Sequence, residues 1–486
     1  MRQQLVKNLF FVLVVNVLVK TVWIFFIDRN VQIRVGYAAY GDFQALFNLG
    51  LIFQILLDFG LTSYNSKEIA TDGKRIRVLF SSMFWTRIIL SLLYFGIVLG
   101  VALGLGYKGL QLPLLIAVLL IQALNSMLVF LRSNVAALHH FRTDGVLAVI
   151  DRLLMIAVCG TLLILPAFAL QFRIEWFVWS QIICYFLASV IAFCVVIRIA
   201  PVPIHFSFRP KMIRKVMVQS APYALLVFLM SIYMRADAVM IERLCVDGKM
   251  QAGIYASAFR LLDVANIFGV MFAGMLLPIF ARMIARKEDV AATIKMAVNI
   301  MMPLAFVVAI VSVCFGAEIM QLLYHKASSG HDGKIFALLM CSFPAYCLMY
   351  IYSTLLTANG NLKLLNKISV LIVVLNLCLH YFFISTYQAL GASITVLITE
   401  WTVSAFVVFA SHRNFSLPHN YRWLLAHLGF VFSTVLLAFS GKALPVHWSI
   451  QLLGILIGAF ILLFFFRFWT ISSIKELLQR KERAQD

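Results

Sequence analysis

Long apolar segments alternate with short polar ones along almost the whole chain. A helix needs about 20 mostly apolar residues to cross the hydrocarbon core of a bilayer, and fourteen segments meet this requirement. They lie at about residues 9–27, 36–63, 78–105, 113–136, 146–170, 176–199, 218–242, 251–278, 293–316, 334–357, 366–386, 390–410, 423–440 and 448–469. The two spans before and after Gly391 are separated only by a short turn. The pattern therefore predicts an all-α, polytopic membrane protein with fourteen transmembrane helices.

The composition agrees with this fold class. The chain has 486 residues, of which 63% are hydrophobic and 12% charged, and its mean hydropathy is +0.96. Soluble domains carry about 25% charged residues, so little of this chain is expected to lie outside the membrane. The formal net charge of +20 would suggest a nucleic-acid partner in a soluble chain. Short cytoplasmic loops of membrane proteins collect Lys and Arg, and no basic segment is long enough to form a domain, so nucleic acid is not expected.

The basic residues also orient the chain. With the N-terminus in the cytoplasm, the predicted inner segments hold more than twice as many Lys and Arg residues as the outer ones, as the positive-inside rule requires. An even number of spans puts both termini on the same side, so we predict an N-in, C-in topology. The first apolar run follows Arg2 and Lys7, but it is longer than the apolar core of about 7–15 residues of a signal peptide.

A weak internal repeat relates the two halves of the chain. A shift of 215 residues places Lys20 on Arg235, Tyr40 on Tyr255, and KEIA (67–70) on the segment that begins at residue 282. Both copies would hold six helices and enter the membrane the same way, which makes the repeat parallel, with a pseudo-twofold axis along the membrane normal. Transporters with such repeats bind substrate between the halves, near the midplane.

The repeat predicts how the chain divides. The predicted parts are an N-terminal lobe with the first six spans (1–199), a cytoplasmic linker (200–217), a C-terminal lobe with the next six spans (218–412), and a final part with two extra spans and a cytoplasmic tail (413–486).

Five basic residues lie within the predicted spans, away from the obvious loops: Lys20, Arg87, Arg132, Arg235 and Arg260. A cation at the centre of a lipid-facing helix costs about 2.5–3.5 kcal/mol on insertion scales. We therefore expect these side chains to line a water-filled cavity between the two halves. Snorkelling is the alternative for Lys20 and Arg132.

Local ion pairs are the alternative for two of these cations. Arg260 and Asp263 have the spacing of a helical pair, whereas Arg235 and Asp237 are two residues apart and do not face each other on a helix. Arg152 and Arg467 lie near predicted span ends, where snorkelling suffices.

Five acidic residues also lie in or at the edge of the spans: Asp42, Asp58, Asp237, Asp263 and Glu400. Asp58 lies near the inner end of its predicted span, where a turn or a contact between helices is an alternative role. A buried carboxylate has a raised pKa and can exchange protons near neutrality. These groups could couple transport to an ion gradient, or they could only neutralise the basic residues.

No cofactor or metal is expected. The eight cysteines show no CxxC and no Cys/His ligand spacing, so neither a zinc site nor a disulfide framework is indicated. GLGYKG (104–109) fits GxGxxG, but it lies in a predicted outer turn with no strand before it. There is also no Walker lysine and no obvious ATP site.

The stretch GYAAYGDFQALFNLGLIFQILLDFGLTSYNSKEIA (36–70) resembles the start of polysaccharide-type flippases of the multidrug/oligosaccharidyl-lipid/polysaccharide exporter superfamily. The segment 235–263, R-x-D followed by GIYASAFRLLD, is similar to the start of their second half. The resemblance implies a flippase of the bacterial cytoplasmic (inner) membrane that moves undecaprenyl-pyrophosphate-linked oligosaccharide, such as O-antigen, capsule or exopolysaccharide repeat units, by alternating access. Such a protein is a transporter and not an enzyme.

The resemblance also implies roles and partners. Lys20, Arg235 and Arg132 would hold the pyrophosphate and sugars, with Arg87 and Arg260 as further substrate-binding candidates. The partners would be the lipid-linked oligosaccharide and membrane lipids, with a polysaccharide polymerase and glycosyltransferases as candidates.

Three other functions are weighed against this one. A flippase for lipid II of peptidoglycan would share the architecture and the cationic cavity. A membrane polysaccharide polymerase or ligase would generally need a long outer loop, and the predicted outer loops here are short. A multidrug exporter of the same superfamily would usually want an acidic cavity, so the sign of the charges argues against it.

Overall fold

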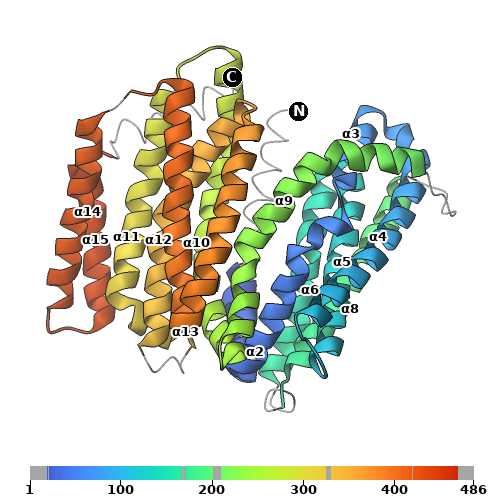
Figure 1. The fold of residues 1–486 in the computed structure, drawn as a ribbon, viewed down its shortest axis with the longest axis horizontal. Helices are drawn as coiled ribbons and strands as arrows, with labels where there is room; N and C mark the ends of the chain where they lie inside the picture. Colours follow the sequence, from blue (N-terminus) through green and yellow to red (C-terminus); the bar gives the residue numbers. More distant parts are fainter. Residues whose placement is uncertain are drawn as a thin grey trace. The chain divides into compact units, whose positions relative to one another are not determined.

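Helices make up every regular element in the part of the chain that the structure describes. A computed structural model describes residues 19, 21–165, 168, 171–200, 210–324, 330–418 and 420–468. Its long helices are α2 (Arg29–Ile52), α3 (Leu61–Thr71), α4 (Ile76–Gly104), α5 (Gln111–Ala137), α6 (Phe141–Ile164), α8 (Ile174–Ile199), α9 (Pro210–Leu244), α10 (Gly248–Ala285), α11 (Ala291–Tyr324), α12 (His331–Ala358), α13 (Leu362–Phe415), α14 (Tyr421–Lys442) and α15 (Trp448–Phe465). Three short helical turns, η1 (Trp23–Asp28), η2 (Gln54–Leu57) and η3 (Gly73–Arg75), complete the set. The predicted all-α fold class is confirmed (Figure 1).

The chain forms two compact units, residues 1–253 and 254–486. The first contains α2 to α9 and the first turns of α10, and α9 packs along α2. The predicted lobes, 1–199 and 218–412, and the predicted linker between them stay a prediction, and half of that linker, residues 201–209, lies outside the described residues.

The first unit is held together by helices that are apolar on most of their surface. Its core contains Leu46 and Leu49 of α2, Tyr94 and Val98 of α4 and Leu119 of α5. These positions recur every three or four residues along each helix, which places them on one face. The opposite faces carry exposed apolar side chains, as expected of helices that meet lipid.

The second unit packs α12 between α11 and α13, and α14 and α15 form a pair against α11. Phe315, Phe430, Ile455 and Leu463 form the core of that last contact. Prolines lie inside α10, α11 and α12. Proline is tolerated in membrane helices because neighbouring groups satisfy the freed carbonyls.

Two apparently continuous helices are sharply broken. In α2, Gly36 has φ 81°, so the polypeptide turns there between the end of the first predicted span and the start of the second. In α13, Gln388 has φ 55° and ψ −134°. Asn376 Nδ2 donates to Thr399 Oγ1 across this break, at 3.3 Å, so the two halves of α13 fold back on each other. The turn predicted near Gly391 is therefore present, three residues earlier.

The second predicted span (36–63) is not one straight helix. The segment Trp23–Ile52 meets Gln54–Thr71 at a bend of 56°, and α3 begins after Gly60, which has φ 81°. The polar end of this predicted span therefore belongs to a separate short helix.

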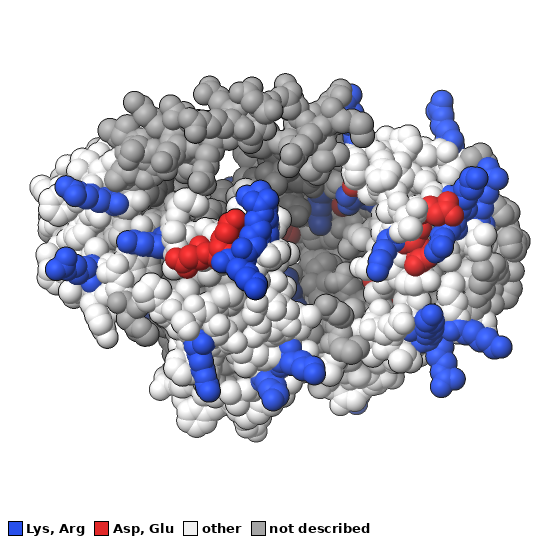
Figure 2. Space-filling model, turned by 90° about the horizontal axis from the view of Figure 1, so that it is seen from above, with Lys and Arg blue, Asp and Glu red and all other residues white. Residues whose placement is uncertain are grey.

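The structure supports a multi-pass membrane protein. Within the described residues, ten helices are long and apolar enough to cross a membrane, or eleven if the bent pair is counted as one span. The count of fourteen spans and the N-in, C-in orientation stay predictions, and most of the first predicted span (9–27) lies outside the described residues. Figure 2 shows one end of the helices, where Lys and Arg outnumber Asp and Glu.

Candidate functional site

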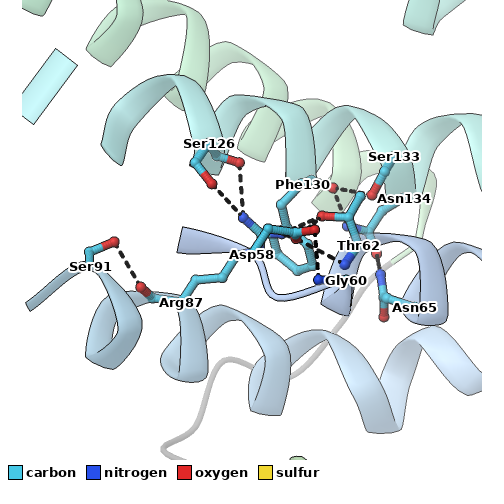
Figure 3. A network of polar contacts seen from close by, with 10 residues as sticks. All are labelled: Asp58, Gly60, Thr62, Asn65, Arg87, Ser91, Ser126, Phe130, Ser133 and Asn134. Carbon is cyan, nitrogen blue, oxygen red and sulfur yellow. Dashed lines mark hydrogen bonds and ion pairs between the residues drawn. The ribbon is translucent and has the colours of Figure 1, made fainter. Parts of the chain in front are cut away.

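Arg87 of α4, one of the predicted cations, is only 2% exposed. Its guanidinium forms an ion pair with Asp58 and a hydrogen bond to Thr62. It also donates to the backbone oxygen and the hydroxyl of Ser126 on α5, at 3.1 and 2.8 Å, and lies 4.9 Å from the ring centre of Phe130. Figure 3 shows these partners converging on Arg87 from three elements.

Asp58 connects this network to the break between α2 and α3. Its carboxylate accepts from the backbone N–H of Gly60 at 3.2 Å and of Thr62 at 3.0 Å. An Asp that accepts from the first N–H groups of a helix caps its N-terminus. Arg87 therefore neutralises the group that starts α3. Its predicted role in substrate binding stays a prediction.

Arg132 lies near the end of α5 and pairs with Asp144 in the first turn of α6. The Nε–Oδ1 distance is 3.0 Å, and both side chains are about one-quarter exposed. This pair joins two consecutive helices, so part of the charge of Arg132 is balanced within the protein. The fork of the guanidinium leaves further donors for another acceptor.

Arg260 and Asp263, on α10, form the helical pair that their spacing allows. Nη1 of Arg260 lies 3.9 Å from Oδ2 of Asp263, and both side chains are partly exposed. An exposed or half-exposed pair at this distance is worth little in stability, about 0–1 kcal/mol.

Arg235 lies in the second half of α9 and is half-buried. No hydrogen bond or ion pair joins it to any other described residue, and the neighbouring Asp237 does not pair with it, as the helical spacing predicted. Asp237 is 4% exposed and accepts from the N–H of Ala238 at 2.7 Å. Lys20, which the repeat aligns with Arg235, lies outside the described residues.

Two predicted acidic residues occupy contrasting places. Asp42 of α2 accepts from Lys249 Nζ at 2.8 Å and from Gln111 Nε2 at 2.6 Å. Glu400, in the second half of α13, is completely buried. Their predicted roles in ion coupling or charge balance stay predictions.

Arg152 is a membrane cation whose position the sequence analysis misjudged. The predicted span 146–170 placed it near an end, but α6 begins at Phe141, so Arg152 lies near the middle of the helix. Its guanidinium carbon lies 5.2 Å from the ring centre of Trp23 and 6.0 Å from that of Tyr185. Its Nε is 3.5 Å from Asp151. In the sequence, the adjacent Asp151 and Arg152 were the signal that could have identified this site.

This arrangement suits a particular chemistry. A guanidinium placed over aromatic rings gains about 0.5–2 kcal/mol from the cation–π attraction. It also binds phosphate oxygens with a planar fork of donors. Arg152 is 30% exposed, so some of its donors can reach a ligand.

An apolar furrow runs beside α14 in the second unit. We use the name α14 furrow for two adjoining cavities of about 460 and 310 Å³ that share Phe306 and Trp401 as lining residues. The larger is also lined by Tyr352, His412 and His427, and the smaller by mostly aliphatic and aromatic side chains. Such a lining can accommodate a hydrocarbon chain.

The chain matches known proteins in sequence and in fold. A family model described as polysaccharide biosynthesis protein matches residues 5–284. The solved structure of the lipid II flippase MurJ in an inward closed conformation has a TM-score of 0.65 and 15% identity, over 97% of this chain and 99% of that one. An inward-facing multidrug resistance MATE family transporter of the MOP superfamily has a TM-score of 0.64 and 14% identity, over 81% and 94%. No curated protein sequence matches the chain.

The two structural likenesses show the transporter fold shared by MurJ and MATE proteins, as the resemblance in the sequence predicted. The family match covers more than half of the chain. The protein therefore belongs to the polysaccharide biosynthesis protein family.

Proposed function

We propose that this protein is a flippase that moves undecaprenyl-pyrophosphate-linked oligosaccharide across the bacterial cytoplasmic membrane by alternating access. The repeat unit would belong to O-antigen, capsule or exopolysaccharide. The membership in a polysaccharide biosynthesis family and the transporter fold both support this activity.

The proposal rests mainly on Arg235, for which the described residues offer no ion-pair partner. Among the predicted cations that the structure describes, Arg87, Arg132 and Arg260 all have acidic partners, whereas Arg235 pairs with no described residue. Arg235 lies within the predicted span 218–242, and an ionisable residue inside a membrane span indicates a functional site by default. A cation that no described residue neutralises can be neutralised by the pyrophosphate of a substrate.

Two other features support the proposal. Arg152, with the rings of Trp23 and Tyr185, offers a guanidinium and aromatic surfaces to a phosphate-linked sugar. The α14 furrow offers an apolar surface for the lipid tail, which would remain in the bilayer while the polar head crosses. The further candidates for contact with the head are Lys20, Arg132, Arg87 and Arg260.

The test is complementation of a strain of the host that lacks this gene. We expect Arg235→Ala to abolish surface polysaccharide and to accumulate the lipid-linked intermediate, while Arg235→Lys keeps part of the activity because the charge remains. Lys334→Ala, an exposed cation at the start of α12, is the matched control and should behave as wild type. Normal export in Arg235→Ala, at a normal protein level in the membrane, would contradict the proposal.

Lipid II is the second candidate substrate. The structural likeness to the lipid II flippase MurJ covers nearly the whole of both chains, and lipid II shares the pyrophosphate and the polyprenyl tail. Rescue of a strain depleted of its lipid II flippase, but not of a strain that lacks its polysaccharide flippase, would favour this alternative.

A polymerase or ligase remains the alternative from another class. Both solved structures described above are of transporters. Purified protein that transfers sugars between lipid-linked acceptors would identify an enzyme. A polysaccharide polymerase and glycosyltransferases stay candidate partners of the proposed flippase.

A further inference from the structure

A second, more polar cavity adjoins the α14 furrow within the second unit. We name it the Lys442 cavity. Among the described residues it encloses about 550 Å³, and both Lys442 and Glu318 line it. Ligand sites usually have volumes of about 300–1,000 Å³. Its wall is shared with the smaller cavity of the furrow, because three residues line both: Val313, Cys314 and Cys341.

Lys442, the last residue of α14, is held at a break in α11. Phe315 departs from helical geometry there, with φ −122° and ψ 20°, and Nζ of Lys442 donates to the backbone oxygen of Cys314. Oε1 of Glu318 lies 3.8 Å from Nζ, which is too far for a hydrogen bond. An ammonium group has three donors, so Lys442 keeps donors for a ligand.

Glu318 keeps acceptors for a ligand in the same way. No hydrogen bond joins its carboxylate to another described residue, and its side chain is 32% exposed, against 44% for Lys442. The lining therefore presents a cation and an anion next to each other, and both can be reached. Such a pair is complementary to a ligand that carries both a phosphate and an ammonium group.

The Lys442 cavity lies at the depth of lipid head groups. Helix α14 has 22 residues, so it is about 33 Å long, close to the hydrocarbon thickness of about 30 Å. Lys442 ends this helix, and Trp448 begins α15. Tryptophan is enriched at membrane interfaces. Lys442 is therefore expected at the level of the lipid phosphates, on the side predicted to face outward.

The smaller cavity of the furrow extends from this level toward the middle of the helices. Phe439 and Val435 of α14 line it, about one and two turns before Lys442. Phe439 is 63% exposed and Val313 is 54% exposed, so the cavity is open at its side. An acyl chain can enter it from the bilayer while the head of the same lipid reaches Lys442 and Glu318.

We propose that the Lys442 cavity binds the head of a phosphatidylethanolamine molecule from the outer leaflet, with an acyl chain in the smaller cavity of the α14 furrow. The phosphate accepts from Nζ of Lys442, and the ammonium group donates to the carboxylate of Glu318. The larger cavity remains for the tail of a transported lipid. The bound phospholipid fastens α14 to α11, and this role goes beyond the proposed transport activity.

The two charges set an order of lipid affinities. Phosphatidylglycerol has the phosphate but no ammonium group, so it makes no contact of this kind with Glu318. Phosphatidylcholine has both charges, but its quaternary nitrogen has no N–H donor. Each should bind about tenfold more weakly than phosphatidylethanolamine, which is the scale of one lost hydrogen bond to a charged group.

The experiment measures, by native mass spectrometry, the binding of each of these lipids to the purified and delipidated protein. Glu318→Gln should weaken the binding of phosphatidylethanolamine about tenfold and leave that of phosphatidylglycerol no weaker. Lys442→Met should weaken the binding of both lipids. Lys363→Met, which changes an exposed lysine at the start of α13, is the matched control and should bind both lipids as wild type does.

A further variant covers the case in which Lys442→Met fails to fold because the carbonyl of Cys314 loses its donor. Val435→Trp fills part of the smaller cavity and should weaken the binding of phosphatidylethanolamine several-fold. The side chain of the adjacent Leu436 is 54% exposed and does not line the cavity. Leu436→Trp is therefore the control for this change, and it should bind the lipid as wild type does.

Three outcomes would overturn the proposal. The first is equal binding of the three phospholipids, or a preference that Glu318→Gln leaves unchanged. The second is stabilisation by glycerophosphoethanolamine, the free head group, to the same extent as by the intact lipid, which would show a site for a soluble phosphate. The third is displacement of phosphatidylethanolamine by undecaprenyl phosphate, which would assign the cavity to the transported lipid. None of these measurements requires transport, so a failure of the flippase assignment would appear only in complementation.

Discussion

Arg87 of α4 and Asp58, at the break between α2 and α3, form an ion pair in the interior of the first unit. Only 3% of the arginine side chain is exposed, against 31% of the aspartate. The pair joins positions 29 residues apart in sequence. The pair neutralises a charged side chain inside an apolar helix. Asp58 also accepts from the first N–H groups of α3, so a new helix can start where the second predicted span should have continued.

The first prediction concerns the stability of this pair. Arg87→Met should lower the free energy of unfolding by about 1–3 kcal/mol, because it leaves the partly exposed carboxylate of Asp58 without its charged partner. The measurement is the thermal unfolding midpoint of the purified protein in detergent, followed by tryptophan fluorescence.

The double variant Arg87→Met, Asp58→Asn is the control for this prediction. Asn keeps a side-chain oxygen for the N–H groups of Gly60 and Thr62, so the cap of α3 survives. We expect it to recover more than half of the lost stability. Equal stability of Arg87→Met and wild type would show that the pair contributes nothing.

The second prediction concerns the cation between two rings. Arg152→Lys keeps the charge but loses the planar group that stacks on Trp23, and Trp23→Leu loses the ring. Each change should cost about 0.5–2 kcal/mol of stability. The double variant should cost less than the sum, because both changes remove the same interaction. A double-mutant cycle of unfolding midpoints measures this coupling, and strict additivity would show that the contact is energetically neutral.

The third prediction concerns the α14 furrow. Val431 lines the larger cavity, whereas the adjacent Phe432 is 64% exposed. Val431→Trp should fill part of the furrow and lower polysaccharide export several-fold in the complementation assay, with the protein level unchanged. Phe432→Trp is the matched control. Loss of export in both variants, or in neither, would remove the assignment of the furrow to the lipid tail.

The sequence predicted the helical class well because each span needs only length and apolar character. The turn in α13 also followed from local signals near Gly391. The start of α6 could not be predicted in the same way. Its first turn, before the apolar run, is polar, so Arg152 appeared to lie near a span end although it lies near the middle of the helix.

Contacts between distant positions explain the other differences. Nothing local in the sequence pairs Arg87 with Asp58, because their approach depends on how α4 packs against the break after α2. The same holds for Arg132 and Asp144, which meet across two helices. The i, i+3 pair Arg260–Asp263 was predictable as an alternative because it lies within one helix.

The last prediction concerns strain at the turn of α13. Gln388 has φ 55° and ψ −134°, a backbone region that is open almost only to glycine and costs other residues about 1–3 kcal/mol. Gln388→Gly should therefore raise the unfolding midpoint by relieving about 1 kcal/mol or more of backbone strain. Part of this gain is lost because glycine has more conformational freedom in the unfolded chain. The neighbouring Gly391 should behave in the opposite way, because a Cβ there would lie 2.0 Å from the carbonyl oxygen of Phe383. Gly391→Ala should lower the midpoint, and a midpoint unchanged in both variants would show that neither backbone strain nor the close approach of the two halves limits the stability of this turn.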